Sequence, residues 1–148
     1  MKTSRLLIAG LLAGAAAAVA FAQANLVQFM PDQIKWAAGP AGVTKDAQAV
    51  VLAGPLDKPV PYTQRVRLAP GGAINPHTHP DARYTTVLSG DLTVGLGDTV
   101  DAARETRYPA GSFVVMPAGQ PHYSLAKNGE VVYQESGYGP TGTNFLKK

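Results

Sequence analysis

The sequence contains no cysteine among its 148 residues. Without thiols the chain can form no disulfide, no thiolate nucleophile and no cysteine-ligated metal site. Any metal must therefore be held by histidine, carboxylate or backbone oxygen. Charged residues are also scarce, at 16% of the chain, and only three histidines are present. These scarcities direct attention to where the three histidines lie.

Long apolar runs are absent except near the amino terminus. There, a basic start precedes an apolar run from Leu6 to Ala22, with small residues spaced as A-x-A at Ala20 and Ala22. This pattern predicts a secretory signal peptide over 1–22 rather than a transmembrane anchor, because much of the run is Ala and Gly and a cleavage site follows at once. We therefore expect a periplasmic or secreted protein with no membrane association after cleavage.

Strong net charge is absent once this leader is set aside. Removing its two basic residues, Lys2 and Arg5, lowers the formal net charge from +3 to +1. The remaining arginines are scattered among carboxylates and form no basic patch. Nucleic acid is therefore excluded as an expected partner, and a small-molecule ligand or substrate is expected instead.

From Ala47 onward the sequence consists of short β-rich runs, each closed by Gly, Pro, Asn or Asp. The runs are AVVLAG, YTQRVRL, YTTVLSG, DLTVGLG, SFVVMP, HYSLA and EVVYQES. Such spacing predicts an all-β fold, an antiparallel sandwich or barrel. In YTQRVRL, alternation places Tyr62, Gln64, Val66 and Leu68 on one face, which we expect to be buried. Residues 95–98 indicate a hairpin turn, and 99–108 a turn or excursion rather than a packed helix.

The remaining segments complete a one-domain organisation. Residues 23–46 mix apolar residues with Pro and Gly without a helical period, which predicts an irregular N-terminal arm. Within it, Trp36 is expected to plug the core or an edge. The barrel is predicted over 47–140 and a C-terminal tail over 141–148.

All three histidines lie in two Gly- and Pro-punctuated strand segments. His77 and His79 fall in GGAINPHTHPDARYTTVLSG, and His122 falls in GSFVVMPAGQPHYSLA. Because alternate residues of a strand point to one face, the first two are expected to share a face. Because every histidine of the chain lies in one of these two segments, a metal site explains their positions better than a role in core packing does.

These two segments resemble the paired motifs of the cupin family, GxxxxxHxHxxxExxxxxxG and GxxxxxPxGxxHxxxN. The positions that match at the family spacing are Gly71, His77, His79, Gly90, Gly111, Pro117, Gly119 and His122. The resemblance implies a single antiparallel jelly-roll β-barrel whose mouth holds a divalent metal through His77, His79 and His122. It also implies a homodimer, since dimers are common in the family.

Two positions depart from the family pattern. Ala126 replaces a motif Asn that is not a ligand, whereas Arg83 stands where the Glu ligand would be. Facing a divalent metal at about 6 Å, this cation would cost roughly 5 kcal/mol if uncompensated. Three arrangements remain open: Arg83 turns outward and pairs with Asp81, it points inward and binds an anionic substrate, or no metal is bound. The sequence does not fix the register of the strand that follows Pro80, so Tyr84 rather than Arg83 could face the barrel interior. Arg83 and Tyr84 are therefore the candidate catalytic residues.

Three neutral imidazoles would leave several metal positions open for oxygen and a chelating substrate. The first hypothesis is thus an exported dioxygenase-type oxidoreductase that uses Fe or Mn on a small, anionic or enolisable molecule. Zn, Ni and Cu also suit imidazole ligands. The alternative is a non-catalytic periplasmic binding or sensing protein, with or without metal. For a hydrolase or isomerase, the sequence offers no sign beyond the expected metal site.

Alternation suggests that the pocket is lined by Gln64, Val66, Phe113, Val115, Ser124 and Gln134.

Overall fold

The computed structural model describes residues 26–147, so the predicted signal peptide over 1–22 lies outside the described residues. In this part of the chain the helical elements are two short 3-10 turns, η1 (Pro31–Gln33) and η2 (Ala102–Arg104). No helix within 26–147 has the length and apolar character needed to cross a membrane. The remaining regular structure is β-strand.

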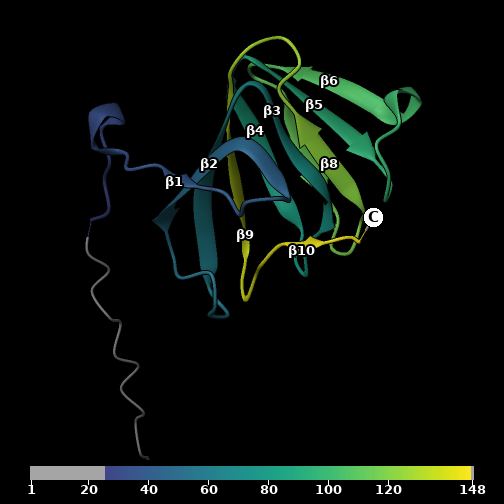
Figure 1. Ribbon diagram of the computed structural model, residues 1–148. Coiled ribbons are helices and arrows are strands. Elements are labelled where there is room, and N and C mark those ends of the chain that lie inside the picture. Colours follow the sequence, from purple (N-terminus) through teal and green to yellow (C-terminus); the bar gives the residue numbers. More distant parts are fainter. Residues whose placement is uncertain (1–25, 148) are drawn as a thin grey trace, which may run out of the picture.

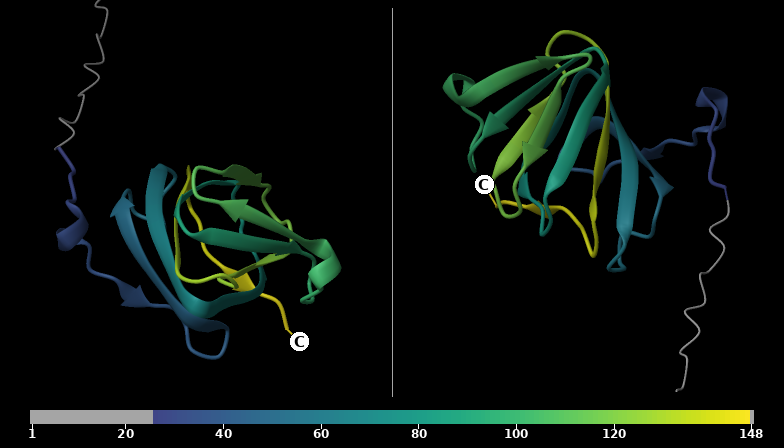
Figure 2. Two further views of the ribbon diagram at one scale, coloured as in Figure 1. Left: turned by 90° about the horizontal axis from the view of Figure 1, so that it is seen from above. Right: turned by 180° about the vertical axis from the view of Figure 1, so that it is seen from behind.

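Ten strands form one nearly closed antiparallel barrel, with the N-terminal segment extending to one side (Figures 1 and 2). They are β1 (Ala37–Ala38), β2 (Thr44–Ala53), β3 (Pro61–Thr78), β4 (Arg83–Ser89), β5 (Asp91–Leu96), β6 (Glu105–Pro109), β7 (Phe113–Met116), β8 (His122–Leu125), β9 (Val131–Tyr138) and β10 (Asn144–Phe145). The pairing order is β6-β5-β8-β3-β9-β4-β7, with β2 and β10 also on β3 and β1 on β2. The prediction of an all-β jelly-roll barrel is confirmed.

Strand β3 joins the two halves of the barrel because it changes partners along its length. Its first part, Pro61–Leu68, pairs with β9, and its second part pairs with β8 from Ala73 onward. Near the change of partner, the amide of Gly71 donates to the carbonyl of Ala126, and the amide of Ala126 donates to that of Gly72. The far end of β3 therefore carries His77 directly beside β8.

The core lies on the inward face of the strands, as the alternation in YTQRVRL predicts. Tyr62, Val66 and Leu68 are buried. On the opposite face, the guanidinium of Arg67 lies 4.9 Å from the ring centre of Trp36, so this tryptophan packs on the outer face of β3 rather than in the core or at an edge. The inward side chains of β3 thus join those of β4, β5 and β9 in one core.

The barrel strands extend beyond the predicted range of 47–140 at both ends. Strand β2 begins at Thr44, and β10 lies within the predicted C-terminal tail. Residues 99–108 form the turn η2 followed by most of β6, which pairs with β5 as a hairpin. The expectation of a turn rather than a packed helix holds for 99–104, whereas 105–108 are strand. The hairpin connection lies between Leu96 and Glu105, so Gly95 and Leu96, expected in the turn, belong to β5.

Candidate metal centre and its cavity

The three histidines meet at one point inside the barrel. His77 lies near the end of β3 and His122 begins β8, and the β3–β8 register places them opposite each other. His79 follows directly after β3. All three are buried, and their ligand atoms lie within 4.8 Å of one another. The predicted convergence of these residues is confirmed.

Each imidazole is oriented by a backbone carbonyl. The Nδ1 atoms lie 2.7 Å, 2.7 Å and 2.9 Å from the carbonyl oxygens of Asn75, Gly142 and Gln120, for His77, His79 and His122 respectively. Because a carbonyl only accepts, Nδ1 carries the hydrogen in His77 and His122, and their Nε2 atoms keep a free lone pair. Nδ1 of His79 faces both the Gly142 carbonyl and an N–H of Arg83, and the tautomer that donates to the shorter Gly142 contact leaves its Nε2 free as well. Orientation of this kind is typical of metal-ligating histidines. The three side chains therefore fit a divalent ion as neutral ligands.

The surroundings also favour the neutral form of each ring. Burial, followed by the charge of His122, lowers the pKa of His77 to about 3. Burial likewise lowers the pKa of His122 and, together with the Arg83 guanidinium, that of His79. The Nη2 of Arg83 lies 3.1 Å from Nδ1 of His79, so the positive charge of the guanidinium disfavours a protonated ring. All three rings are neutral near pH 7.

Arg83 lies beside the histidines with only 2% of its surface exposed. Its Nη1 donates to Oε2 of Glu135 at 2.8 Å, and its Nε lies 3.4 Å from Oδ1 of Asp81. Its Nη2 donates to the hydroxyl of Thr141 at 2.9 Å. The predicted pairing with Asp81 is present, but the side chain is buried rather than turned outward, because Glu135 provides a second carboxylate inside the barrel.

Tyr84 lies on the outer face of β4, with 51% of its surface exposed. The β4–β7 register explains this, since Arg83 pairs with the buried Met116 and Tyr84 with the exposed Val115. The alternative in which the Tyr84 phenol reaches the histidines is therefore wrong. Participation of Arg83 or Tyr84 in a reaction stays a prediction.

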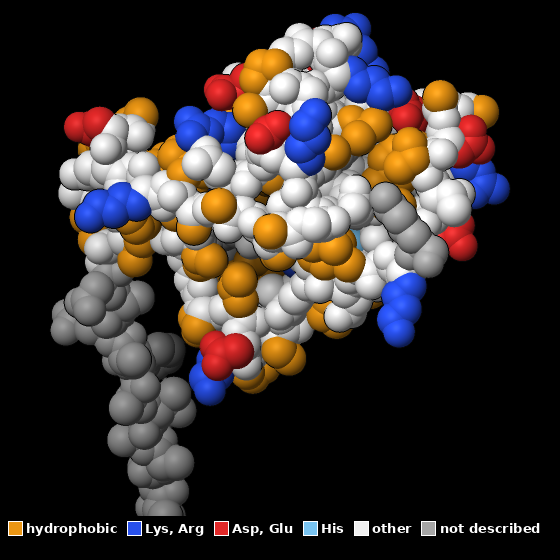
Figure 3. Space-filling view, viewed as in Figure 1, with side chains coloured by type: hydrophobic (Ala, Val, Ile, Leu, Met, Phe, Trp, Pro, Cys, Tyr) orange, Lys and Arg blue, Asp and Glu red, His pale blue; other side chains and the backbone are white. Residues whose placement is uncertain are grey.

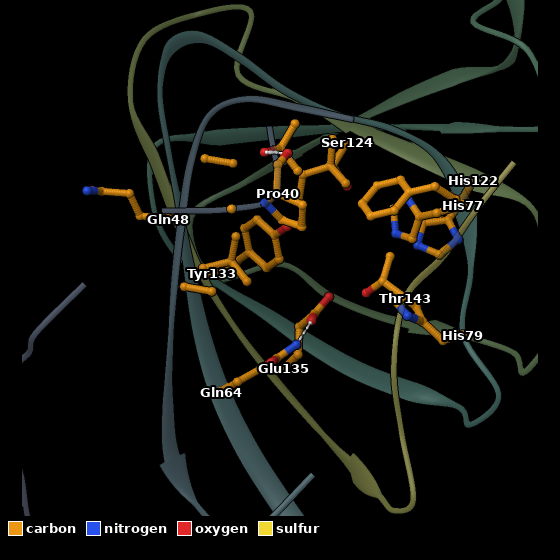
Figure 4. A pocket seen from close by; sticks show the side chains of 17 residues that line it. Pro40, Gln48, Gln64, His77, His79, His122, Ser124, Tyr133, Glu135 and Thr143 are labelled. Atoms are coloured by element: carbon orange, nitrogen blue, oxygen red, sulfur yellow. Dashed lines mark hydrogen bonds between the residues drawn. The ribbon is translucent and has the colours of Figure 1, made fainter. Parts of the chain in front are cut away.

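A cavity of about 150 Å³ opens beside the histidines (Figure 4). Besides the three histidines, its lining includes Thr44, Ala47, Gln48, Ala49, Gln64, Val66, Ile74, Ser124, Tyr133, Glu135, Thr143 and Phe145. On the face seen in Figure 3, apolar and uncharged side chains surround a hollowed centre, and most charged groups lie around the margin. The cavity itself combines apolar surface with polar side chains from histidine, glutamine, threonine, serine and glutamate.

The predicted pocket lining is only partly correct. Gln64, Val66 and Ser124 line the cavity. Phe113 and Val115 are exposed on β7, and Gln134 on β9 accepts a hydrogen bond from Arg65 on the outer face. These last three assignments are wrong, because the strands present their other faces to the interior.

Glu135 is the functional candidate that the sequence reasoning missed. It projects into the cavity, where its Oε2 accepts a hydrogen bond from Nε2 of Gln64 at 2.8 Å (Figure 4). The same oxygen accepts a hydrogen bond from Nη1 of Arg83. In β9, Val131, Tyr133 and Glu135 share the buried face, but the sequence alone does not say which face of this strand is inward. The cavity thus combines three neutral metal donors with one carboxylate.

The model of the cupin domain family matches residues 64–134, a range that includes all three histidines. Among curated proteins, nectarin-1 of Nicotiana langsdorffii x Nicotiana sanderae is 38% identical over 68 residues, which are 45% of this chain and 29% of that protein. Germin-like protein 3-1 of Oryza sativa subsp. japonica is 40% identical over 60 residues, 40% of this chain and 27% of that protein. The matches therefore span less than a third of these relatives.

Solved structures share the fold at lower sequence identity. The polyketide cyclase RemF of Streptomyces resistomycificus has a TM-score of 0.72 at 16% identity, covering 84% of this chain and 87% of that one. KdgF of Halomonas sp. has a TM-score of 0.59 at 19% identity, covering 74% and 92%. An oxalate oxidase has a TM-score of 0.57 at 24% identity, covering 74% and 60%. These likenesses support the barrel architecture.

Proposed function

Because the chain belongs to the cupin superfamily, we propose that it is a metal-dependent oxidoreductase of the dioxygenase type, acting on a small molecule in the cavity. The observation that carries this proposal is the convergence of three buried, neutral imidazoles, those of His77, His79 and His122, on the cavity wall. When bound there, Fe or Mn would supply Lewis acidity and redox capacity.

The chain's own groups define what the site does to a ligand. The three histidines would hold the ion without adding negative charge, so its full charge would favour an enolisable or anionic oxygen donor. The apolar walls, including Val66, Ile74 and Phe145, exclude water from the bound molecule. Among the structures of similar fold, one protein is named an oxalate oxidase, which is in keeping with oxidation at such a site.

The test is metal content followed by oxygen uptake. The protein expressed without residues 1–22 and without a histidine tag is reconstituted with Fe or Mn beside a His77→Ala, His79→Ala double variant. We expect near-stoichiometric metal that the variant loses, and oxygen consumption with some member of a panel of diketones, phenols and hydroxy acids. A Thr86→Ala, Gln134→Ala variant, altered only on the outer face, controls for general damage. Metal binding without oxygen uptake across the panel would remove the oxidoreductase assignment.

A second candidate is an exported binding or sensing protein that holds its ligand without converting it. The observation that favours it is the pairing of the cavity's carboxylate, Glu135, with Arg83 and Gln64, which limits its freedom to exchange protons. A ligand that raises the melting temperature and is recovered unchanged supports this function, whereas recovery of a transformed product rules it out. Export after cleavage near Ala22 is part of both proposals, and the amino-terminal sequence of the protein recovered from the periplasm or medium checks it.

A further inference from the structure

We propose that Glu135 selects the ligand of this cavity, accepting a hydrogen bond from the hydroxyl group of a small, neutral, single-ring phenol or enol. The inference rests on the proposed function in that the ligand occupies the cavity beside the three histidines. It goes further by assigning a recognition role to Glu135 and a chemical class to the ligand.

Glu135 is held in place with one oxygen available. It is 9% exposed, and both of its hydrogen-bond donors, Gln64 and Arg83, contact the same atom, Oε2. Within residues 26–147 no donor is bonded to Oε1, and Figure 4 shows the carboxylate directed into the cavity. A carboxylate oxygen only accepts, so a ligand group that meets Oε1 must bring a hydrogen.

The charges around this carboxylate disfavour an anionic group at the same position. Arg83 is the buried cation of the cluster and lies between two carboxylates, those of Asp81 and Glu135. The cluster therefore has a formal charge of −1 and no cationic charge left over for a ligand carboxylate. Two carboxylates facing each other in a buried site repel unless a proton lies between them. A neutral hydroxyl avoids this repulsion and supplies the hydrogen.

The size and walls of the cavity indicate a single ring. Its volume of about 150 Å³ is similar to that of an engineered apolar cavity that binds benzene. Tyr133 and Phe145 contribute aromatic surface, and Val66 and Ile74 contribute aliphatic surface. A ring would pack against these side chains while its hydroxyl reaches Oε1.

Three ligands of matched ring size test the proposal on the unmodified, metal-free protein by calorimetric titration. Phenol carries the hydroxyl, anisole has the same ring and oxygen without the hydrogen, and benzoate carries a carboxylate. We expect phenol to bind about tenfold or more tightly than anisole, the range for a hydrogen bond to a charged acceptor, and benzoate to bind no better than anisole. Equal affinities for phenol and anisole, or no measurable phenol binding, would overturn the proposal.

A Glu135→Gln variant tests the residue itself, with the exposed Glu130→Gln as its matched control. We expect the first variant to lose the preference for phenol over anisole and to gain affinity for benzoate, since its amide offers a donor. The control should retain the wild-type order. If Glu135→Gln does not fold, the comparison of ligands on the wild-type protein still decides. These titrations measure binding to the metal-free protein and need no turnover. A negative oxygen-uptake screen therefore does not change their result. Conversely, the absence of a preference for phenol over anisole does not decide whether the protein is an oxidoreductase, which the metal and oxygen-uptake experiment tests.

Discussion

At the scale of single residues, Arg83 marks the departure of this chain from the family motif. A cation facing a metal position would be strongly unfavourable alone, but Asp81 and Glu135 offset its charge. Asp81 is in turn bonded by the hydroxyl of Tyr62 at 2.5 Å, and burial and this bond raise the pKa of that phenol. The loss of an anionic ligand is therefore accompanied by a carboxylate on β9 that, with Asp81, compensates the positive charge of Arg83.

Replacing Arg83 by Met should destabilise the protein strongly. The carboxylates of Asp81 and Glu135 would remain buried without their cation, and breaking a buried pair in this way costs about 3–5 kcal/mol. Urea denaturation gives the change in the free energy of unfolding. Arg107→Met is the matched control, because Arg107 pairs with Asp91 while its side chain is 60% exposed, and such pairs contribute below about 1 kcal/mol. Equal losses in the two variants would contradict the role assigned to Arg83.

The sequence revealed the metal donors but not the carboxylate opposite them. His77, His79 and His122 could be predicted because their spacing is local to two motifs. Glu135 could not, because both faces of β9 begin with valine, and the neighbouring Gln134 fits an inward position equally well by alternation. The choice between them is made by β3 and β4, whose Gln64 and Arg83 lie 71 and 52 residues away in the chain.

At the scale of elements, the turn between β4 and β5 depends on Gly90. This residue has φ of +72°, and a Cβ there would lie 2.1 Å from the carbonyl oxygen of Glu130. Gly119, in the β7–β8 connection, has a similar φ of +73° but open space around it. The amide of Gly119 donates to the carbonyl of His79 at 2.8 Å. Both glycines belong to the paired motifs. Gly90 is required both by its positive φ and by the nearby Glu130 carbonyl, whereas Gly119 is required by its positive φ alone.

Gly90→Ala should therefore be much more destabilising than Gly119→Ala. The second change meets only the backbone cost of a left-handed residue, about 1–2 kcal/mol. The first adds a collision with a backbone oxygen that cannot be relieved by moving a side chain. Thermal unfolding of the two variants measures the difference, and similar melting temperatures would show that the β4–β5 turn relaxes freely.

The strands were more predictable than the connections between them. The seven runs chosen by alternation and turn residues correspond to β2, β3, β4, β5, β7, β8 and β9. Strand β6 was missed because ETRYP has little apolar character, and β10 because its two residues are defined by pairing with β3 rather than by a pattern of their own. Whether such short segments at an edge or an end form strands is decided by their tertiary pairing rather than by their own sequence pattern.

At the scale of the whole molecule, the buried histidines should make the stability of the metal-free protein depend on pH. The pKa of His77 is lowered to about 3 in the folded state, while the unfolded chain retains about 6.5. As the pH falls below about 6.5, the unfolded chain takes up a proton that the folded protein does not, so stability is lost as the pH falls. His77 contributes up to about 1.4 kcal/mol per pH unit in this range, and the lowered pKa values of His79 and His122 act in the same direction.

Calorimetry between about pH 6.5 and 5, above the usual range of the carboxylates, isolates this contribution. We expect the melting temperature of the metal-free protein to fall across this window and to fall less steeply in a His77→Gln variant. A constant melting temperature would contradict the burial assigned to the neutral rings.

Export and the homodimer implied by the family resemblance stay predictions. Sedimentation of the mature protein checks whether it is a dimer.

The segment from Thr141 to Phe145 closes one side of the cavity, and this has a consequence for the kinetics of ligand exchange. Phe145 pairs with His77, and Gly142 accepts the hydrogen bond from His79. Strand β10 is held by two residue pairs with β3 and by the hydrogen bond from the Leu146 amide to the Pro76 carbonyl. Opening this segment breaks far fewer contacts than global unfolding does. The residence time of a bound molecule would then depend on how often this segment opens, and ligands of different affinity would leave at similar rates whenever opening is the slow step.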